Sequence, residues 1–188
     1  CVFWSNSAIT RLIFISSVGV LGDNSLSGTI TNNSPYNPQN SYTTSKMEAE
    51  MALDTFSASV LEIIILRPPL VYGPGAPGNF GRLLRLITAC RVLPFGKFKE
   101  PRSMISINNF CDLIVHTIAI STPITNKFVV SDGSDWTTEE LILMIASAMQ
   151  VKVYNPQIPL FLMHYLSRII GRSEDIKKLA QPLLINST

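Results

Sequence analysis

Ser41-Tyr42-Thr43-Thr44-Ser45-Lys46 opens a segment whose pattern predicts a helix through about Phe56. Tyr42 and Lys46 stand four residues apart, so on a helix they share one face and lie side by side. The lysine charge favours the phenolate form of the tyrosine. We therefore expect the pKa of this phenol to lie below its ordinary value of about 10, toward the range of an acid–base catalyst. The pair indicates a proton-transfer site, and the other interpretation of the isolated pattern is an exposed pair on a helix surface.

An apolar run upstream, from Arg11 to Ser16, is typical of a buried parallel strand. Ser16 and Ser17 stand at its carboxyl end, which is the edge where open α/β sheets place their ligands. There the Ser17 hydroxyl is available to hold the substrate oxygen whose proton Tyr42 moves. The other interpretation of Ser17 is a turn hydroxyl that caps the local backbone.

Further elements follow along the chain. Glu48 and Glu50 are expected to favour the early turns of the Tyr42 helix through the helix dipole. A second apolar strand ends at Arg67-Pro68-Pro69, because proline cannot donate to a strand ladder. This second strand is predicted at 61–66. The remaining predicted elements are strands at 92–96, 103–107 and 128–131, a helix from 79, a helix to about 120 capped by Asn108-Asn109, and a helix at 137–150 opened by a capping box.

Composition excludes several classes of function. The 188 residues suffice for one domain with a real core, and no run approaches the roughly 20 apolar residues of a membrane span. A net charge of +2 from scattered basic residues does not indicate nucleic-acid binding. Only 15% of residues are charged, against about 25% in ordinary domains, so we expect surface to be buried against a partner subunit or further chain. Three cysteines without metal-ligand spacing indicate reduced thiols in a cytoplasmic protein and no metal site.

Four phrases occur in a fixed order: Phe14–Gly22 (FISSVGVLG), Pro38–Lys46 (PQNSYTTSK), Leu66–Gly75 (LRPPLVYGPG) and Arg102–Ile107 (RSMISI). Together they resemble the extended branch of the short-chain dehydrogenase/reductase superfamily. That branch contains NAD-dependent nucleotide-sugar epimerases, dehydratases and 4-keto-sugar reductases. The resemblance covers roughly Arg11 to Met149 and continues more faintly to the end.

The resemblance implies an α/β fold: the C-terminal half of a Rossmann-like, doubly wound parallel sheet, with a small α/β substrate domain. Residues 1–75, with 103–132, are then the second half of a dinucleotide-binding domain, and residues 76–102 and 133–188 an incomplete substrate domain. The Gly-rich turn of such a fold belongs before Ser17, so the chain is expected to be a fragment that binds NAD poorly by itself. Gly73–Gly78 matches the glycine spacing, but Pro74 and Pro77 remove amide donors that a pyrophosphate needs.

The resemblance also assigns site residues. Ser17, Tyr42 and Lys46 are the implied catalytic group, and Ser16, Tyr42, Lys46 and Pro68 the implied contacts to NAD, with NADP left open. Asn79 and Arg102 are expected near the substrate diphosphate, with Phe95 as a wall against its base; a guanidinium fork suits two phosphate oxygens. The other interpretations are a helix cap for Asn79 and a solvated loop residue for Arg102.

The implied reaction is proton and hydride transfer at the sugar C4 of a nucleotide sugar. In 4,6-dehydratases Thr-Asp-Glu usually stands where this chain has Ser17-Val18-Gly19, so dehydration is disfavoured. An epimerase is placed ahead of a 4-keto reductase. The alternatives are a hydroxysteroid- or flavonoid-type reductase and a non-catalytic, truncated relative. The resemblance further implies a homodimer formed through the Tyr42 helix.

Overall fold

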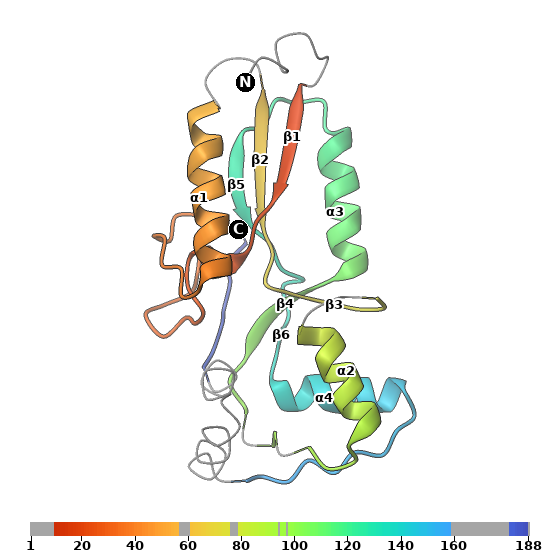
Figure 1. Cartoon of the computed structure of the whole chain (residues 1–188). Coiled ribbons are helices and arrows are strands. Elements are labelled where there is room, and N and C mark those ends of the chain that lie inside the picture. The colour runs from red at the N-terminus through yellow and green to blue at the C-terminus, as the bar shows by residue number, and fades with distance from the viewer. Residues whose placement is uncertain are drawn as a thin grey trace.

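A parallel three-stranded sheet forms the centre of the computed structural model, which describes residues 10–56, 61–75, 79–93, 95–96, 98–158 and 181–187. Its strands are β1 (Arg11–Ile15), β2 (Glu62–Arg67) and β5 (Asn126–Val129), in the order β1-β2-β5 (Figure 1). Both pairings are parallel, with Ile13 beside Ile64 and Leu66 beside Phe128. The predicted first two strands are confirmed, because continuous apolar runs suit strands covered on both faces.

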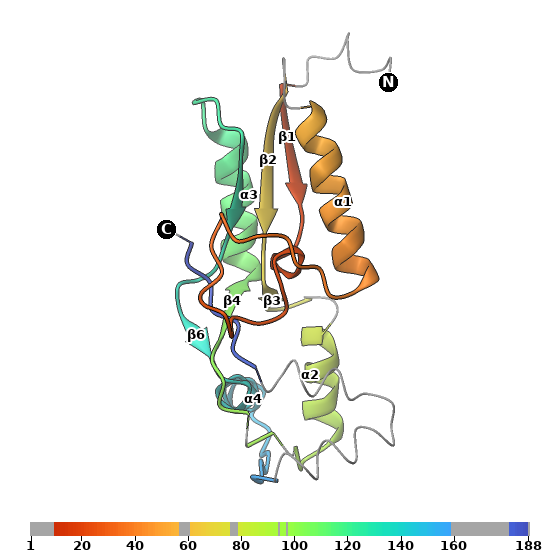
Figure 2. The same ribbon diagram turned by 90° about the vertical axis from the view of Figure 1, so that its left-hand side faces the viewer.

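Alternation along β2 decides what each face of the sheet contacts. The helices α1 (Ser41–Phe56) and α3 (Ile107–Ala119) lie on opposite sides of the sheet (Figures 1 and 2). Ile64 and Leu66 share a buried cluster with Phe110 of α3. Arg67, on the other parity, contacts α1 through Glu50. Successive strand residues point to opposite faces, so this strand serves both helices.

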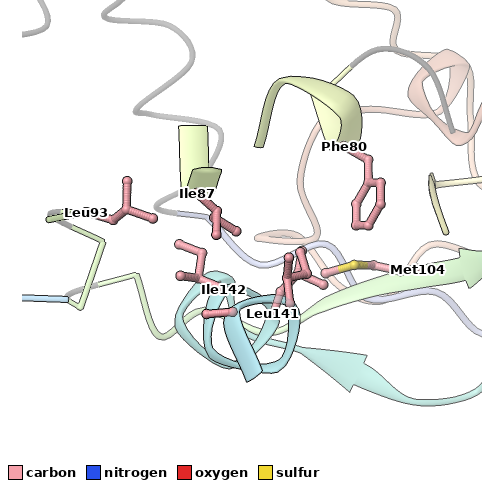
Figure 3. Packing of buried hydrophobic residues seen from close by; sticks show 8 residues of the cluster. Phe80, Ile87, Leu93, Met104, Leu141 and Ile142 are labelled. Atoms are coloured by element: carbon pink, nitrogen blue, oxygen red, sulfur yellow. The ribbon is translucent and has the colours of Figure 1, made fainter. Parts of the chain in front are cut away.

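A second group of elements continues from the end of β2. The strands β3 (Leu70–Tyr72) and β4 (Arg102–Ser106) are parallel, and β6 (Asp135–Trp136) pairs antiparallel with β4. The helices α2 (Asn79–Ala89) and α4 (Thr138–Ala148) pack beside them. Figure 3 shows the apolar cluster that joins these elements, with Phe80, Ile87, Leu93, Met104, Leu141 and Ile142 labelled. Among the helices described, none is both long and apolar enough to cross a membrane.

Two local predictions are wrong. The cap of α3 is Ser106, whose hydroxyl accepts a hydrogen bond from the Asn109 amide, rather than Asn108-Asn109. Ser106 ends β4 in an extended conformation, as a cap requires, so the helix starts directly from the strand. The strand predicted at 92–96 is reduced, in its described residues, to a single bridge between Val92 and Tyr154.

The capping box predicted at Thr137 is confirmed. Its hydroxyl accepts from the Glu140 amide at 3.1 Å, and the Glu140 carboxylate accepts from the Thr137 amide at 2.9 Å. Thr137→Ala should therefore lower the free energy of unfolding by about 1 kcal/mol, measured by urea denaturation. The control is Ser134→Ala, which removes an exposed loop hydroxyl three residues earlier. Equal stability of the two variants would contradict the role of the cap.

Candidate active site

The Lys46 ammonium lies at the carboxyl end of β1. Its Nζ donates to the Ile15 carbonyl oxygen at 2.9 Å and stands 4.8 Å from the centre of the Phe14 ring. This carbonyl immediately precedes Ser16 and Ser17. An ammonium has three donors, so the bond to Ile15 leaves capacity for hydroxyl groups of a ligand at this edge.

Tyr42 stands in the first turn of α1 and is 57% exposed, so the core does not enclose it. The start of this helix is fixed by Asn40, whose Oδ1 accepts from the Thr43 amide at 3.0 Å. Thr43 itself is buried, and its Oγ1 accepts from the amides of Gln39 and Asn40 at 3.2 Å each. These bonds hold the turn that presents Tyr42.

Ser17 adjoins the same helix start. Its Oγ accepts from the Gly19 amide at 3.1 Å and so caps the 3₁₀ turn η1 (Val18–Val20). A Cβ atom on Gly19 would lie 2.7 Å from Thr43 Cγ2 and 3.4 Å from Ser17 Oγ, so only glycine allows this close approach of η1 to α1. The capping interpretation of Ser17 is therefore correct. A hydroxyl that accepts one bond can still donate another, so capping is compatible with a second role.

Ser16 and Pro68 belong to the framework of this edge. The Ser16 amide donates to the Leu66 carbonyl at 2.8 Å, and the Val18 amide donates to the Pro68 carbonyl at 3.0 Å. Both residues are buried. The structure thus places five of the predicted residues on neighbouring segments, which are β1, α1 and the end of β2: Ser16, Ser17, Tyr42, Lys46 and Pro68.

The structure also contains a buried ion pair, between Glu50 of α1 and Arg67 of β2, that the sequence analysis does not predict. Glu50 and Arg67 are 0% and 2% exposed, and Arg67 Nη2 lies 2.6 Å from Glu50 Oε2. Arg67 Nε donates to both carboxylate oxygens, at 3.1 and 3.2 Å. Glu50 lies in the middle of α1, so its predicted role at the helix start is wrong. One sequence feature could have indicated this contact: Glu50 stands four residues after Lys46 and so shares the helix face of Tyr42 and Lys46, which points to the sheet.

The pKa of Glu50 reflects this environment. Burial alone would raise the pKa of the carboxyl, but hydrogen bonds from Arg67 and Tyr36, together with the charge of Arg67, outweigh burial and hold it below the ordinary value of 4.5. Glu50 therefore stays ionised at neutral pH although it is enclosed.

The predicted substrate residues lie in the second group of elements. Arg102 begins β4 and its Nη1 donates to the Gln181 carbonyl at 2.7 Å; burial lowers its pKa, while the charge of Asp23 opposes that shift. Phe95 stacks in a tilted arrangement on Phe98, 5.7 Å between ring centres, and packs against the cluster of Figure 3. Asn79 is the first residue of α2, and its side chain lies outside the described residues. Arg102 and Phe95 thus belong to the second group of elements and not to the segments that carry the Tyr42 group.

A cavity of about 500 Å³ lies on the other side of the sheet, between α3, β2 and β5. Its lining is mainly apolar and includes Ile64, Leu113 and Phe128, with His116 and Asp132 among the polar residues. None of the predicted site residues lines it. The Tyr42 group therefore remains the candidate site, because it combines a cation, a phenol and a hydroxyl at the carboxyl edge of the sheet.

Residues 2–128 match the NAD-dependent epimerase/dehydratase family. The chain belongs to this family. It is 35% identical, over 184 residues, to a UDP-glucose 4-epimerase from Vibrio cholerae, an alignment that covers 96% of this chain and 56% of the relative. The chain thus spans little more than half the length of this epimerase.

Solved structures show that the family fold is present. A UDP-glucuronic acid 4-epimerase from Bacillus cereus, in complex with UDP-glucuronic acid and NAD, aligns with a TM-score of 0.71 at 16% identity, over 97% of this chain and 54% of that one. A dTDP-4-dehydrorhamnose reductase from Bacillus anthracis, in complex with NADP, aligns with a TM-score of 0.68 at 16% identity, over 95% and 57%. The predicted α/β, Rossmann-like class is confirmed for this epimerase/dehydratase chain.

Gly19→Ala tests the close approach of η1 and α1. The added methyl meets Thr43 Cγ2, which cannot easily move away because the Thr43 hydroxyl is hydrogen-bonded to the Gln39 and Asn40 amides. The free energy of unfolding should therefore fall by about 1–3 kcal/mol in a denaturant titration. The matched rescue is Gly19→Ala with Thr43→Ser, which removes the opposing methyl but keeps the hydroxyl. Stability that does not recover in the double variant would argue against this contact.

Glu50→Gln should lower stability most at neutral pH. Removing one partner of a buried pair costs about 3–5 kcal/mol, because the Arg67 charge is left uncompensated. The folded-state pKa of Glu50 lies below its unfolded value, so the contribution is complete above about pH 5 and is lost as pH falls through the folded pKa. Urea titrations should therefore show the gap between wild type and variant narrowing on acidification. A gap that is constant down to about pH 3 would contradict this assignment.

Proposed function

We propose that the complete protein catalyses NAD(P)-dependent oxidation and reduction at the sugar C4 of a nucleotide sugar, with epimerisation as its net reaction. The observation that carries the proposal is the exposed Tyr42 next to Lys46, which is bonded to the end of β1. Ser17 stands in the turn packed against the same helix. Membership of the epimerase/dehydratase family supports the reaction class.

The residues present fit a nicotinamide cofactor at this edge. The Lys46 ammonium keeps donors suited to the hydroxyls of a ribose, and Ser16 and Pro68 form the adjoining backbone. When bound, the nicotinamide supplies the acceptor and donor of the hydride. We propose NAD, with NADP as the other candidate, because residues 2–128 match the NAD-dependent epimerase/dehydratase family.

Tyr42 would act as the acid–base group. As a phenolate it takes the proton of the sugar 4-hydroxyl while the C4 hydrogen leaves as hydride, which gives a 4-ketone and a neutral tyrosine. The positive charge of Lys46 stabilises the phenolate, and the Ser17 hydroxyl donates a hydrogen bond to the same sugar oxygen. Returning hydride to the opposite face of the ketone, with the proton from Tyr42, yields the C4 epimer. A reductase would perform the return step alone.

The second group of elements would serve the substrate. We propose that residues 76–102 and 133–188 belong to a substrate domain in which Asn79, Phe95 and Arg102 face the nucleotide diphosphate. A hydroxysteroid- or flavonoid-type reductase has no substrate diphosphate for Arg102 to bind, so this alternative would leave the guanidinium directed to solvent. Arg102 is instead half-buried and donates to the Gln181 carbonyl, which does not favour that alternative.

We also propose a homodimer formed through α1. Met51 and Phe56 of this helix are 52% and 57% exposed, and exposed large apolar side chains suit a subunit interface. Cys90 and Cys111 are free thiols, which suits a cytoplasmic location.

Tyr42→Phe tests the proton-transfer role in the complete polypeptide that the gene encodes. The variant keeps the ring but loses the exchangeable proton, so kcat for conversion of UDP-glucose to its C4 epimer should fall about 10²–10⁴-fold. Binding of UDP, measured by calorimetry, should stay within about twofold, since the phenol is proposed to contact the sugar and the nicotinamide cofactor but not the nucleotide of the substrate. The control is Tyr154→Phe, which removes a phenol that is 68% exposed, against 57% for Tyr42, and that is not one of the proposed site residues. Full activity of Tyr42→Phe would exclude the proposed mechanism.

A further inference from the structure

Glu50 occupies a defined place relative to the proposed catalytic residues. Tyr42, Lys46 and Glu50 follow one another at intervals of four on α1, so they form one stripe that turns gradually around the helix. Along this stripe exposure falls from 57% at Tyr42 to 0% at Glu50. The same helix face therefore presents the phenol at the edge of the sheet and inserts the carboxylate beneath it.

Arg67 occupies a matching place relative to Ser17. It is the last residue of β2, and its carbonyl accepts from the Val130 amide at 3.4 Å. The carbonyl of the next residue, Pro68, accepts a hydrogen bond at 3.0 Å from the amide of Val18, the residue that follows Ser17. The backbone that carries the guanidinium is thus tied directly to the turn that carries the Ser17 hydroxyl.

The ion pair joins these two parts in a fixed orientation. Three contacts between the guanidinium and the carboxylate, at 2.6–3.2 Å, restrict how the planar groups meet. Since the desolvation of two buried charges offsets much of their attraction, such a pair contributes less to net stability than to geometry. What it does specify is where α1 sits along the end of β2.

The surrounding groups make that orientation rigid. The Tyr36 hydroxyl donates to Glu50 Oε2 at 2.8 Å and accepts from Arg67 Nη2 at 3.3 Å and from Lys127 Nζ at 2.9 Å. Arg67 Nη1 also reaches the Asn32 carbonyl at 3.4 Å. The carboxylate therefore has partners from β2 and from the loop before α1, which leaves it few other positions.

We propose that Glu50 and Arg67 are positioning residues that align Tyr42 and Lys46 of α1 with Ser17 for proton transfer. The inference deepens the proposed function and rests on it. Neither residue touches the substrate; each acts through the placement of the helix relative to the end of β2. A displacement of about 1 Å between reacting groups is enough to slow an enzyme about a hundredfold.

The test compares variants of the complete polypeptide with UDP-glucose as substrate and C4-epimer formation as readout. Arg67→Lys keeps the buried positive charge but loses the planar fork, and Glu50→Gln keeps the shape of the side chain but loses its charge. Both should lower kcat about 10- to 100-fold, after correction for the folded fraction by circular dichroism, with KM within about twofold of wild type. Glu62→Gln is the matched control, because it removes an ion pair with the same 2.6 Å separation, formed with Arg11 at the opposite end of β2 from Arg67. It should keep kcat within about twofold.

The outcomes separate this inference from the proposed function. The positioning role would be overturned if kcat fell only in proportion to the unfolded fraction, or if folded Arg67→Lys kept the wild-type kcat. In either case an inactive Tyr42→Phe variant would still uphold the proposed function. A Tyr42→Phe variant with full activity would overturn both. Glu62→Gln losing as much kcat as Arg67→Lys would also overturn the inference, since an ion pair at the other end of β2 would then have the same effect.

Discussion

The carboxylate of Glu50 and the guanidinium of Arg67 are enclosed together between α1 and β2, and neither charge is stable there without the other. The attachment of α1 to the sheet combines such polar contacts with the packing of Met47 against an apolar cluster that includes Val18 and Val129. Its buried residues are Thr43 and Glu50, and Lys46 reaches the strand through the Ile15 carbonyl. Hydrogen bonds require defined directions, whereas apolar contacts tolerate sliding. The helix is consequently held in one register, which is the condition for a site built from side chains of separate elements.

The two faces of the sheet differ in the contacts they make with their helices. On the α1 side of the sheet, charged and polar residues meet at the carboxyl edge, where Tyr42, Lys46 and Ser17 lie in neighbouring segments. On the α3 side, Ile64 and Leu66 meet Phe110 in an apolar cluster. Because one strand supplies both faces by alternation, the difference arises from single positions of β2. Arg67, at its end, is the position that gives the α1 side its buried cation.

Much of the fold could be predicted from local patterns. The apolar runs before Ser17 and Arg67 form β1 and β2, and Thr137 with Glu140 opens α4 as a capping box. Such features depend on residues close in sequence, so a pattern contains the information needed. The cap of α3 was misplaced because Ser106 ends a strand, and its hydroxyl becomes a cap only through the abrupt turn after β4.

For the candidate site, the sequence by itself determined the spacing of Tyr42 and Lys46, and with it their common helix face, because i and i+4 are fixed by helix geometry. It also determined that Ser17 follows a strand. Only the tertiary structure decided that Glu50 enters the core rather than supporting the helix start, since this depends on Arg67, 17 residues further along the chain, facing α1. It likewise decided that Gly19 meets Thr43. Neither contact has a local signature, because each is a distance between elements that is set when the helix docks on the sheet.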